Sequence, residues 1–299
     1  MLNFKKLTLE DIQKISPYFE YSENKTCDNT IGGTFMWRDF FSVEYAEFEN
    51  TLIFKAKVIY RGGITAFTVP LGKNEKDILG CMEQLDKYCR SNEIPVTYCT
   101  ATAGDMHYLN ALYREIELFQ EINWSDYLYR ADDLKYLAGR KYSGQRNHIN
   151  YFKKTYPDWA FEEITEDNIG EVKDFYNRFN LTANKDSEIF AEEQKKTLEV
   201  LDNYRIYKMP GGLLRIGRLV AAFAVGEIWR NVLFVHIEKA DFGIRGAYQV
   251  INNEFVRHFA SDDIEFINRE EDVGDEGLRT SKKSYHPCEI IDKYIAAVK

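Results

Sequence analysis

Hydrophobic and polar side chains alternate along three neighbouring segments in the first part of the chain. These segments are residues 43–48, 52–59 and 63–69. A period of two predicts β-strands, and the adjacent glycines between the second and third segments predict a hairpin turn. Residues 75–92 instead place hydrophobic side chains three or four positions apart, which predicts one amphipathic helix.

The second half of the chain shows the same kinds of pattern. The apolar, β-branched run at residues 219–240 predicts two strands that turn at Arg230-Asn231. A helix is expected at 246–260, a strand at 263–270, and a further strand at 203–209. Each half reads as helix, antiparallel meander, long helix, strand, helix and strand. We therefore predict two similar units of an α/β (α+β, mixed-sheet) fold, residues 1–135 and 136–299.

The amino-acid composition limits the binding partners and the cellular location that we expect for this protein. The 299 residues carry a formal net charge of −9, which disfavours general binding to nucleic acids or anionic membranes but permits a local basic patch. The chain begins without an apolar signal segment and has no run of 18 apolar residues. The five cysteines form no C-x-x-C pattern. We expect a cytoplasmic protein with reduced thiols, no metal site and no integral membrane association.

Residues 134–154 are rich in Lys and Arg and contain no acidic residue. Glycines flank a turn in this segment, and tyrosines lie between the cations. One interpretation is a solvated helix between the units. The other is a phosphate-facing strip for a nucleotide, CoA or the end of a tRNA.

Residues 267–287 combine a polar strand with a basic helix. With a period of two, Asn268, Glu270 and Asp272 would share one face of the strand and line a cleft. Arg279 and Lys282 lie about a turn apart on the helix that follows. The alternative is a surface helix stabilised by salt bridges.

Residues 232–255 contain the candidate base. If the strand is regular, His236 and Glu238 share a face, so that the carboxylate could orient the imidazole. Glu227 on the neighbouring strand is a rival base, and His236 could also be purely structural. Arg245 and Gly246 precede a helix whose first amides could bind phosphate. The chain contains no sequence motif of a nucleophilic enzyme, so covalent catalysis is not indicated.

Three segments together resemble the C-terminal domain family of bacterial phosphatidylglycerol lysyltransferases. They read GRKYSGQRNHINYF, HIEKADFGIRGAYQVINNEF and INREEDVGDEGLRTSKKSYHP. That family is similar to tandem GNAT-like proteins, with two units of the acyl-CoA N-acyltransferase type. The resemblance implies transfer of an acyl or aminoacyl group from acyl-CoA or aminoacyl-tRNA to an amine or hydroxyl.

We accordingly expect a transferase site in the second unit, with no tightly bound cofactor. The donor would be the co-substrate, tRNA a candidate partner, and the acceptor a small molecule or a peptide. The alternative is a non-catalytic module that binds a nucleotide, CoA or a tRNA end. The expected catalytic residues are His236, Glu238, Glu227 and Tyr285; the expected donor-binding and phosphate-binding residues are Arg140, Lys141, Arg146, Asn147, Lys239, Arg245, Gly246, Arg279 and Lys282; the expected site-lining residues are Asn268, Glu270 and Asp272.

Overall fold

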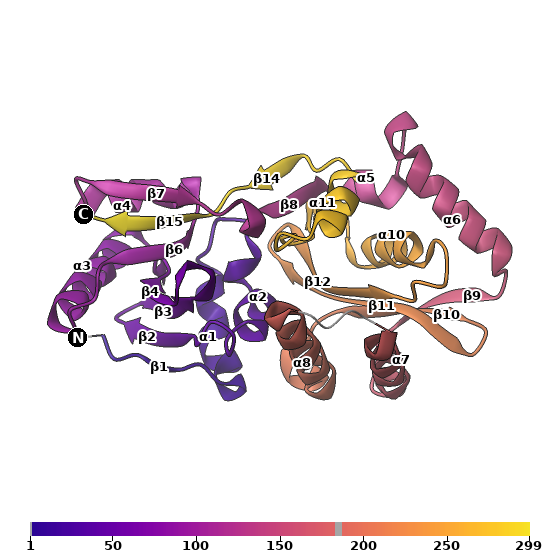
Figure 1. The fold of residues 1–299 in the computed structure, drawn as a ribbon, viewed down its shortest axis with the longest axis horizontal. Coiled ribbons are helices and arrows are strands. Elements are labelled where there is room, and N and C mark those ends of the chain that lie inside the picture. The colour runs from indigo at the N-terminus through magenta and orange to yellow at the C-terminus, as the bar shows by residue number, and fades with distance from the viewer. Residues whose placement is uncertain (1, 183–186) are drawn as a thin grey trace. The chain divides into compact units, whose positions relative to one another are not determined.

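The computed structural model describes residues 2–182 and 187–299. The chain forms two compact units, each with its own mixed sheet (Figure 1). Unit 1 comprises Met1–Ser125 together with Ile291–Lys299, and unit 2 comprises Asp126–Ile290. This division differs from the expected boundary at 135/136, because residues 126–130 add a strand to the second sheet and the C-terminal residues return to the first.

The sheet of unit 1 contains the last strand of the chain between two strands from its first half. Its strand order is β1-β2-β3-β4-β6-β15-β7, with β5 paired to β3. β15 pairs antiparallel with both β6 and β7, so its central residues Ile295 and Ala296 are buried. The strands are β1 (Lys5–Lys6), β2 (Glu44–Phe48), β3 (Thr51–Val58), β4 (Ile64–Phe67), β5 (Leu71–Gly72), β6 (Thr97–Ala101), β7 (Ile116–Gln120) and β15 (Tyr294–Val298).

The α-helices of unit 1 are α1 (Ile12–Phe19), α2 (Ile31–Met36), α3 (Glu75–Ser91) and α4 (Met106–Leu112). Among them, α1 and α3 pack against strands β3 and β5 of this sheet. α3 begins where the Asn74 side chain accepts a hydrogen bond from the Asp77 amide. Its buried Ile78, Met82 and Leu85 pack into the core of unit 1, as their spacing predicted.

Unit 2 holds the second sheet, in the order β14-β8-β13-β12-β11-β10-β9. Its strands are β8 (Asp126–Arg130), β9 (Trp159–Glu163), β10 (Gly211–Ile216), β11 (Leu219–Trp229), β12 (Val232–Ala240), β13 (Phe266–Asn268) and β14 (Glu289–Ile291). Its helices are α5 (Ala131–Tyr136), α6 (Ser143–Thr155), α7 (Ile169–Thr182), α8 (Glu188–Asp202), α9 (Tyr204–Tyr207), α10 (Ala247–Phe259) and α11 (Glu276–Lys283). The mixed α/β fold class predicted from the sequence is confirmed.

One expected strand is a helix. Residues 204–207 form α9, and the glycines that follow it, Gly211 and Gly212, belong to β10. A Cβ at Gly211 would lie 2.3 Å from the Tyr204 hydroxyl, and one at Gly212 would lie 2.3 Å from the Phe161 ring. The glycines therefore let bulky aromatic side chains pack directly onto the strand.

Helix α10 lies on one face of the second sheet, and its start is tightly packed. Val250, Ile251 and Phe255 join the core of unit 2 with Leu233 and Val235 of β12. Just before the helix, Gly246 has a left-handed φ of +92°, and a Cβ there would lie 2.6 Å from the His148 carbonyl oxygen on α6.

No helix in the described part of the chain combines the length and the hydrophobicity that a membrane crossing requires.

Candidate functional site

The sheet of unit 2 opens between β12 and β13. These two strands pair in parallel only from Val232 with Phe266 to Phe234 with Asn268. Beyond these pairs β12 continues to Ala240, whereas β13 has ended at Asn268. The residues that follow Phe234 and Asn268 therefore flank an interruption of the sheet, and the expected catalytic and site-lining residues gather there.

A β-bulge at His236 changes the expected side-chain alternation. Val225 of β11 pairs with Ile237 and Gly226 pairs with Val235, so His236 is the extra residue. The His236 ring remains beside Phe234, with centroids 6.2 Å apart, whereas Glu238 reaches Asn252 on α10. His236 and Glu238 therefore do not form the base and orienting pair that a regular strand would have given.

His236 lies between two other carboxylates. Its Nδ1 is 2.6 Å from a Glu270 oxygen, and its Nε2 is 3.4 Å from a Glu227 oxygen. The side chain is only 1% exposed. Burial alone would lower the pKa of His236, but the contacts with Glu227 and Glu270 outweigh it and raise the pKa to about 10. At neutral pH His236 is therefore a cation and cannot accept another proton.

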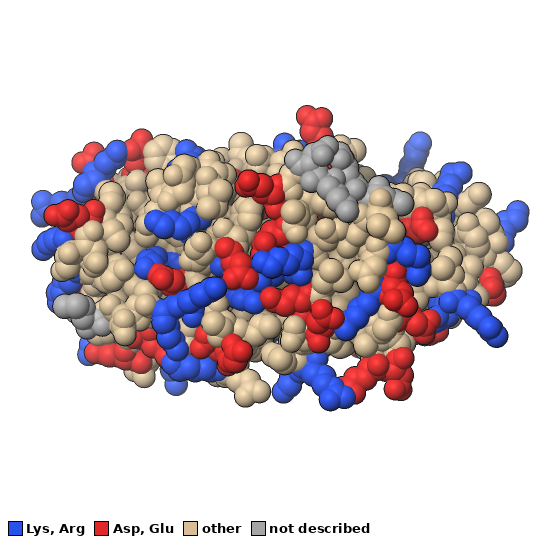
Figure 2. Space-filling model, turned by 60° about the horizontal axis from the view of Figure 1, so that its bottom comes forward, with Lys and Arg blue, Asp and Glu red and all other residues tan. Residues whose placement is uncertain are grey.

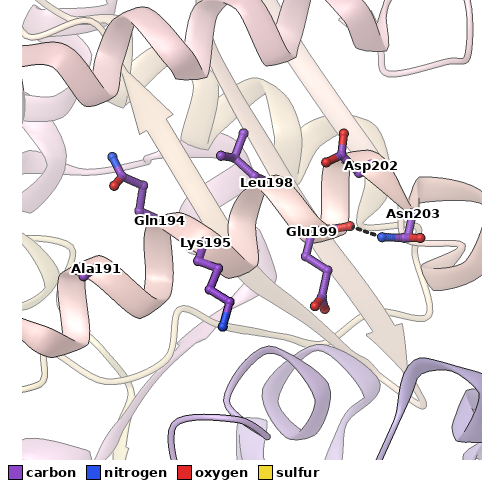
Figure 3. Close-up of a pocket in the computed structure, with 7 residues that line it drawn as sticks. All are labelled: Ala191, Gln194, Lys195, Leu198, Glu199, Asp202 and Asn203. Atoms are coloured by element: carbon purple, nitrogen blue, oxygen red, sulfur yellow. Dashed lines mark hydrogen bonds between the residues drawn. The ribbon is translucent and has the colours of Figure 1, made fainter.

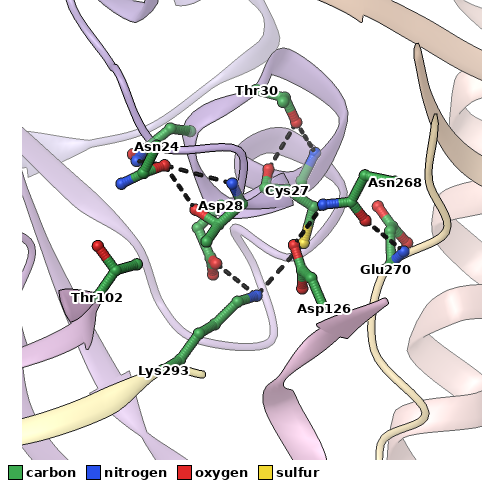
Figure 4. Close-up of polar contacts among 12 residues, drawn as sticks. Asn24, Cys27, Asp28, Thr30, Thr102, Asp126, Asn268, Glu270 and Lys293 are labelled. Carbon is green, nitrogen blue, oxygen red and sulfur yellow. Dashed lines mark hydrogen bonds and ion pairs between the residues drawn. The ribbon is translucent and has the colours of Figure 1, made fainter. Parts of the chain in front are cut away.

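Glu270 is held in an uncommon backbone conformation. Its φ is +56°, in the left-handed region. Its amide donates to the Asn268 side-chain oxygen at 2.6 Å, and the Asn268 amide group donates to Asp126 at 2.8 Å (Figure 4). Burial raises the pKa of the Glu270 carboxyl, while His236 opposes that rise. Strained residues fixed by their surroundings are typical of functional sites.

Asp272 holds the turn that leads to α11 in place. Its carboxylate accepts from the Tyr127 hydroxyl at 2.7 Å, from two nitrogens of Arg279 at 2.8 Å each, and from the Gly274 amide at 2.9 Å. Burial opposes ionisation, but these donors outweigh it and lower the pKa of Asp272 to about 2. Asp272 was expected to line a cleft, and Arg279 was expected to bind the donor. In the structure these two side chains form hydrogen bonds with each other.

A third polar group lies on the α10 side of β12. Glu238 accepts from Asn252 at 2.8 Å and from Arg269 at 3.1 Å. The Arg269 guanidinium carbon is 4.8 Å from the centre of the Tyr285 ring and 5.9 Å from that of Tyr129. Burial raises the pKa of the Tyr285 hydroxyl, which makes it a poor source of protons at neutral pH.

Most of the expected phosphate-binding cations already contact protein groups. Arg146 donates to the Gly139 carbonyl at 2.7 Å and to that of Leu137; Lys282 donates to the carbonyls of Arg269 and Glu271; Lys141 pairs with Asp133; Lys239 pairs with Glu193. Arg140, Asn147 and Arg245 are exposed, and Arg245 lies over the Tyr151 ring. Gly246 serves the packing of α6 against the start of α10. On the face drawn in Figure 2, Lys and Arg side chains stand beside Asp and Glu side chains.

The segments 134–154 and 267–287 contact each other through groups other than the side chains of the predicted cations. The Tyr142 hydroxyl donates to the Tyr285 carbonyl at 3.1 Å, and Gln145 donates to the Ser284 carbonyl at 2.8 Å. The His286 ring lies 5.5 Å from that of Tyr142. This contact fixes the start of α6 beside the end of α11.

A pocket of about 470 Å³ lies elsewhere in unit 2, along α8 and the start of α9 (Figure 3). It contains none of the residues that the sequence singled out. Its lining comprises Ala191, Gln194, Lys195, Leu198, Glu199, Asp202 and Asn203.

Three residues of the site region, Asp126, Asn252 and Arg269, are not among the residues predicted from the sequence. Asp126 fixes Asn268, while Asn252 and Arg269 contact Glu238. Asn252 and Asn253 interrupt the apolar face of a predicted helix, which is a signal that could have found Asn252. Asp126 gave no local signal, because its role comes from pairing β8 with β13.

Known proteins resemble this chain in family and in fold. The family model described as "Phosphatidylglycerol lysyltransferase, C-terminal" matches residues 19–297. A conserved protein of unknown function from Bacteroides thetaiotaomicron VPI-5482 is 31% identical, and the alignment covers 100% of both chains with a TM-score of 0.89. L-PGS from Bacillus licheniformis is 16% identical, with 96% of this chain and 91% of that chain covered and a TM-score of 0.67. FemX is 7% identical, with 99% and 97% covered and a TM-score of 0.61. The chain therefore shares its fold with L-PGS and with FemX.

Proposed function

The chain belongs to the family of phosphatidylglycerol lysyltransferase C-terminal domains, a family of transferases, and on this premise we propose that unit 2 transfers an aminoacyl group from an activated ester to an amine or hydroxyl acceptor. The observation that carries this proposal is the buried Glu227–His236–Glu270 arrangement at the interruption between β12 and β13.

Glu270 is the proposed general base. It is the most exposed of the three groups, with 17% of its side chain accessible against 1% for His236 and 10% for Glu227. Burial raises its pKa, which makes its carboxylate a stronger proton acceptor than an ordinary glutamate. His236, held by Glu227 on its other nitrogen, orients the Glu270 carboxylate.

The proposed transfer requires neither a metal ion nor an oxidant or reductant. The acceptor nitrogen or oxygen attacks the ester carbonyl carbon, a new C–N or C–O bond forms, and the acceptor proton passes to Glu270. The C–O bond to the donor then breaks, and Glu270 returns the proton to the departing oxygen. General-base assistance of this kind contributes about 10²–10⁴-fold in rate.

One feature supports an aminoacyl ester over acyl-CoA as the donor, namely membership in a family described by a lysyl transfer. Acyl-CoA remains the comparison donor in the test.

The test measures label transfer by the full chain and its Glu270→Gln variant. Radiolabelled lysyl-tRNA is supplied with vesicles containing phosphatidylglycerol, and labelled acetyl-CoA is supplied in parallel with free lysine. We expect product from lysyl-tRNA and at least about a 100-fold loss in Glu270→Gln. Glu265→Gln, an exposed carboxylate just before β13, should retain full activity. The acidic limb of kcat/KM should lie above pH 4.5, because burial raises the Glu270 pKa.

Three outcomes would contradict parts of this proposal. Product from acetyl-CoA alone would reassign the donor. Full activity in Glu270→Gln would remove Glu270 as the base. Salt-sensitive binding of lysyl-tRNA with neither product nor donor cleavage over hours would favour a non-catalytic binding module.

A further inference from the structure

A buried amide and a buried guanidinium flank the interruption of the second sheet, each with one polar atom that has no hydrogen-bond partner. Asn252 is 1% exposed and the Arg269 side chain is 9% exposed. Within the residues that the structure describes, the Asn252 side-chain oxygen and Arg269 Nη1 have no partner. Buried polar atoms are nearly always paired. Because Asn252 and Arg269 both bind the Glu238 carboxylate, one ligand beside Glu238 would satisfy both atoms.

One carboxylate joins the two groups. Glu238 accepts from the Asn252 side-chain nitrogen at 2.8 Å and from Arg269 Nη2 at 3.1 Å. A carboxylate only accepts hydrogen bonds, so the Asn252 amide must present its nitrogen to Glu238 and keep its oxygen for another donor. The charges of Glu238 and Arg269 compensate each other. A ligand here therefore has to offer hydrogen-bonding groups of the right kinds, and it needs no particular net charge.

The ligand must supply one donor and one acceptor. Asn252 requires an N–H or ammonium group, and Arg269 Nη1 requires a carbonyl, carboxylate or developing oxyanion. An aminoacyl ester has both groups on adjacent carbons. Its amino group is the donor on Cα, and its ester carbonyl is the acceptor on the next carbon. A simple acyl group has the carbonyl alone and would leave the Asn252 oxygen buried without a partner.

We infer that Asn252 and Arg269 recognise the α-amino group and the carbonyl of the aminoacyl donor, and so discriminate aminoacyl from plain acyl esters. The inference rests on the proposed function and assigns its specificity. Asn252 would bind the ammonium, Arg269 would bind the carbonyl oxygen as it gains negative charge, and Glu238 would position both. The Tyr129 and Tyr285 rings beside Arg269 would help to fix its orientation.

The test compares two donors that differ only in the α-amino group. Lysyl-tRNA and 6-aminohexanoyl-tRNA share the ester and the terminal ammonium, and the measured quantity is the ratio of their cleavage rates. We expect wild type to prefer lysyl-tRNA at least about tenfold, and Asn252→Ala to bring the ratio close to one. Asn253→Ala is the matched control, because this neighbouring amide donates to the backbone carbonyls of Leu134 and Lys135. Its ratio should equal that of wild type.

A binding measurement separates this inference from the proposed function. Isothermal titration calorimetry with lysine methyl ester and 6-aminohexanoic acid methyl ester needs no turnover, and Asn252→Ala should lose the preference for the amino ester. Arg269→Lys keeps the charge but loses the planar donors, so both esters should bind more weakly. If wild type binds the two esters equally, or Asn252→Ala keeps the wild-type preference, the inference is wrong even where transfer occurs. Selective ester binding without any transfer would retain the inference and reject the proposed function.

Discussion

Replacing Asp272 by Asn keeps the shape of the side chain and removes its charge. In the folded protein this carboxylate, with its side chain 1% exposed, accepts from Tyr127, Gly274 and twice from Arg279. An Asn at this position offers one acceptor oxygen instead of two and presents an NH₂ group to a donor. We therefore expect the turn between β13 and α11 to lose part of its stabilisation.

The size of the effect follows from the pKa of Asp272. Contacts in the folded state lower it from 3.8 to about 2. Each pKa unit corresponds to about 1.4 kcal/mol, so the charged form contributes about 2 kcal/mol to the free energy of unfolding. Because the folded pKa is depressed, this contribution is present above pH 3.8 and is lost as the pH falls through about 2.

The assay is urea unfolding of wild type and Asp272→Asn at several pH values, followed by hydrogen-exchange mass spectrometry of the segment 270–284. Asp272→Asn should be less stable by about 2 kcal/mol at pH 7, and the difference should shrink between pH 4 and pH 2. Glu276→Gln, an exposed carboxylate at the start of α11, is the control and should change stability by less than about 0.5 kcal/mol. A difference that is absent at pH 7, or that does not change with pH, would refute this reasoning.

His236 should remain protonated well above pH 8, because Glu227 and Glu270 raise its pKa to about 10, and ¹³C NMR of labelled histidine would reveal a titration near 6.5 if this is wrong. Its contribution to stability should be complete below about pH 6.5 and should be lost as the pH rises toward 10. Gly246→Ala should cost about 3 kcal/mol of unfolding free energy in a urea titration, from the left-handed backbone and the 2.6 Å approach to α6. Gly243→Ala, where φ is not left-handed, should stay within about 0.5 kcal/mol, and equal losses in both variants would contradict the packing role of Gly246.

The sequence predicted much of the fold because its signals are local. Alternating residues gave β2, β3 and β4, and the spacing of Ile78, Met82 and Leu85 gave α3. The same reasoning placed α10 and selected Glu227, His236 and Glu270. It could not show that Glu227 and Glu270 both contact His236, because these residues lie on different parts of the chain.

Predictions from local sequence patterns failed where a residue far away in the sequence determines the structure. The bulge at His236 depends on how β12 pairs with β11, and it sends Glu238 to α10 instead of leaving it beside His236. The expected phosphate-binding cation Lys239 is another example, since it pairs with Glu193, which lies 46 residues away in the sequence. The positive charge of a Lys or Arg side chain does not by itself show which acceptor group the side chain will contact.

What this sequence determined by itself is the order and type of most elements and the segments that carry its chemistry, because side-chain periodicity and turn residues act over a few positions. Tertiary structure alone decided that residues 294–298 complete the sheet of unit 1, that His236 lies between Glu227 and Glu270, and that Asn252 and Arg269 share Glu238. The physical reason is that strand pairing, burial and ion pairing depend on which distant groups the folded chain brings into contact, and these interactions set both the register and the protonation of the site.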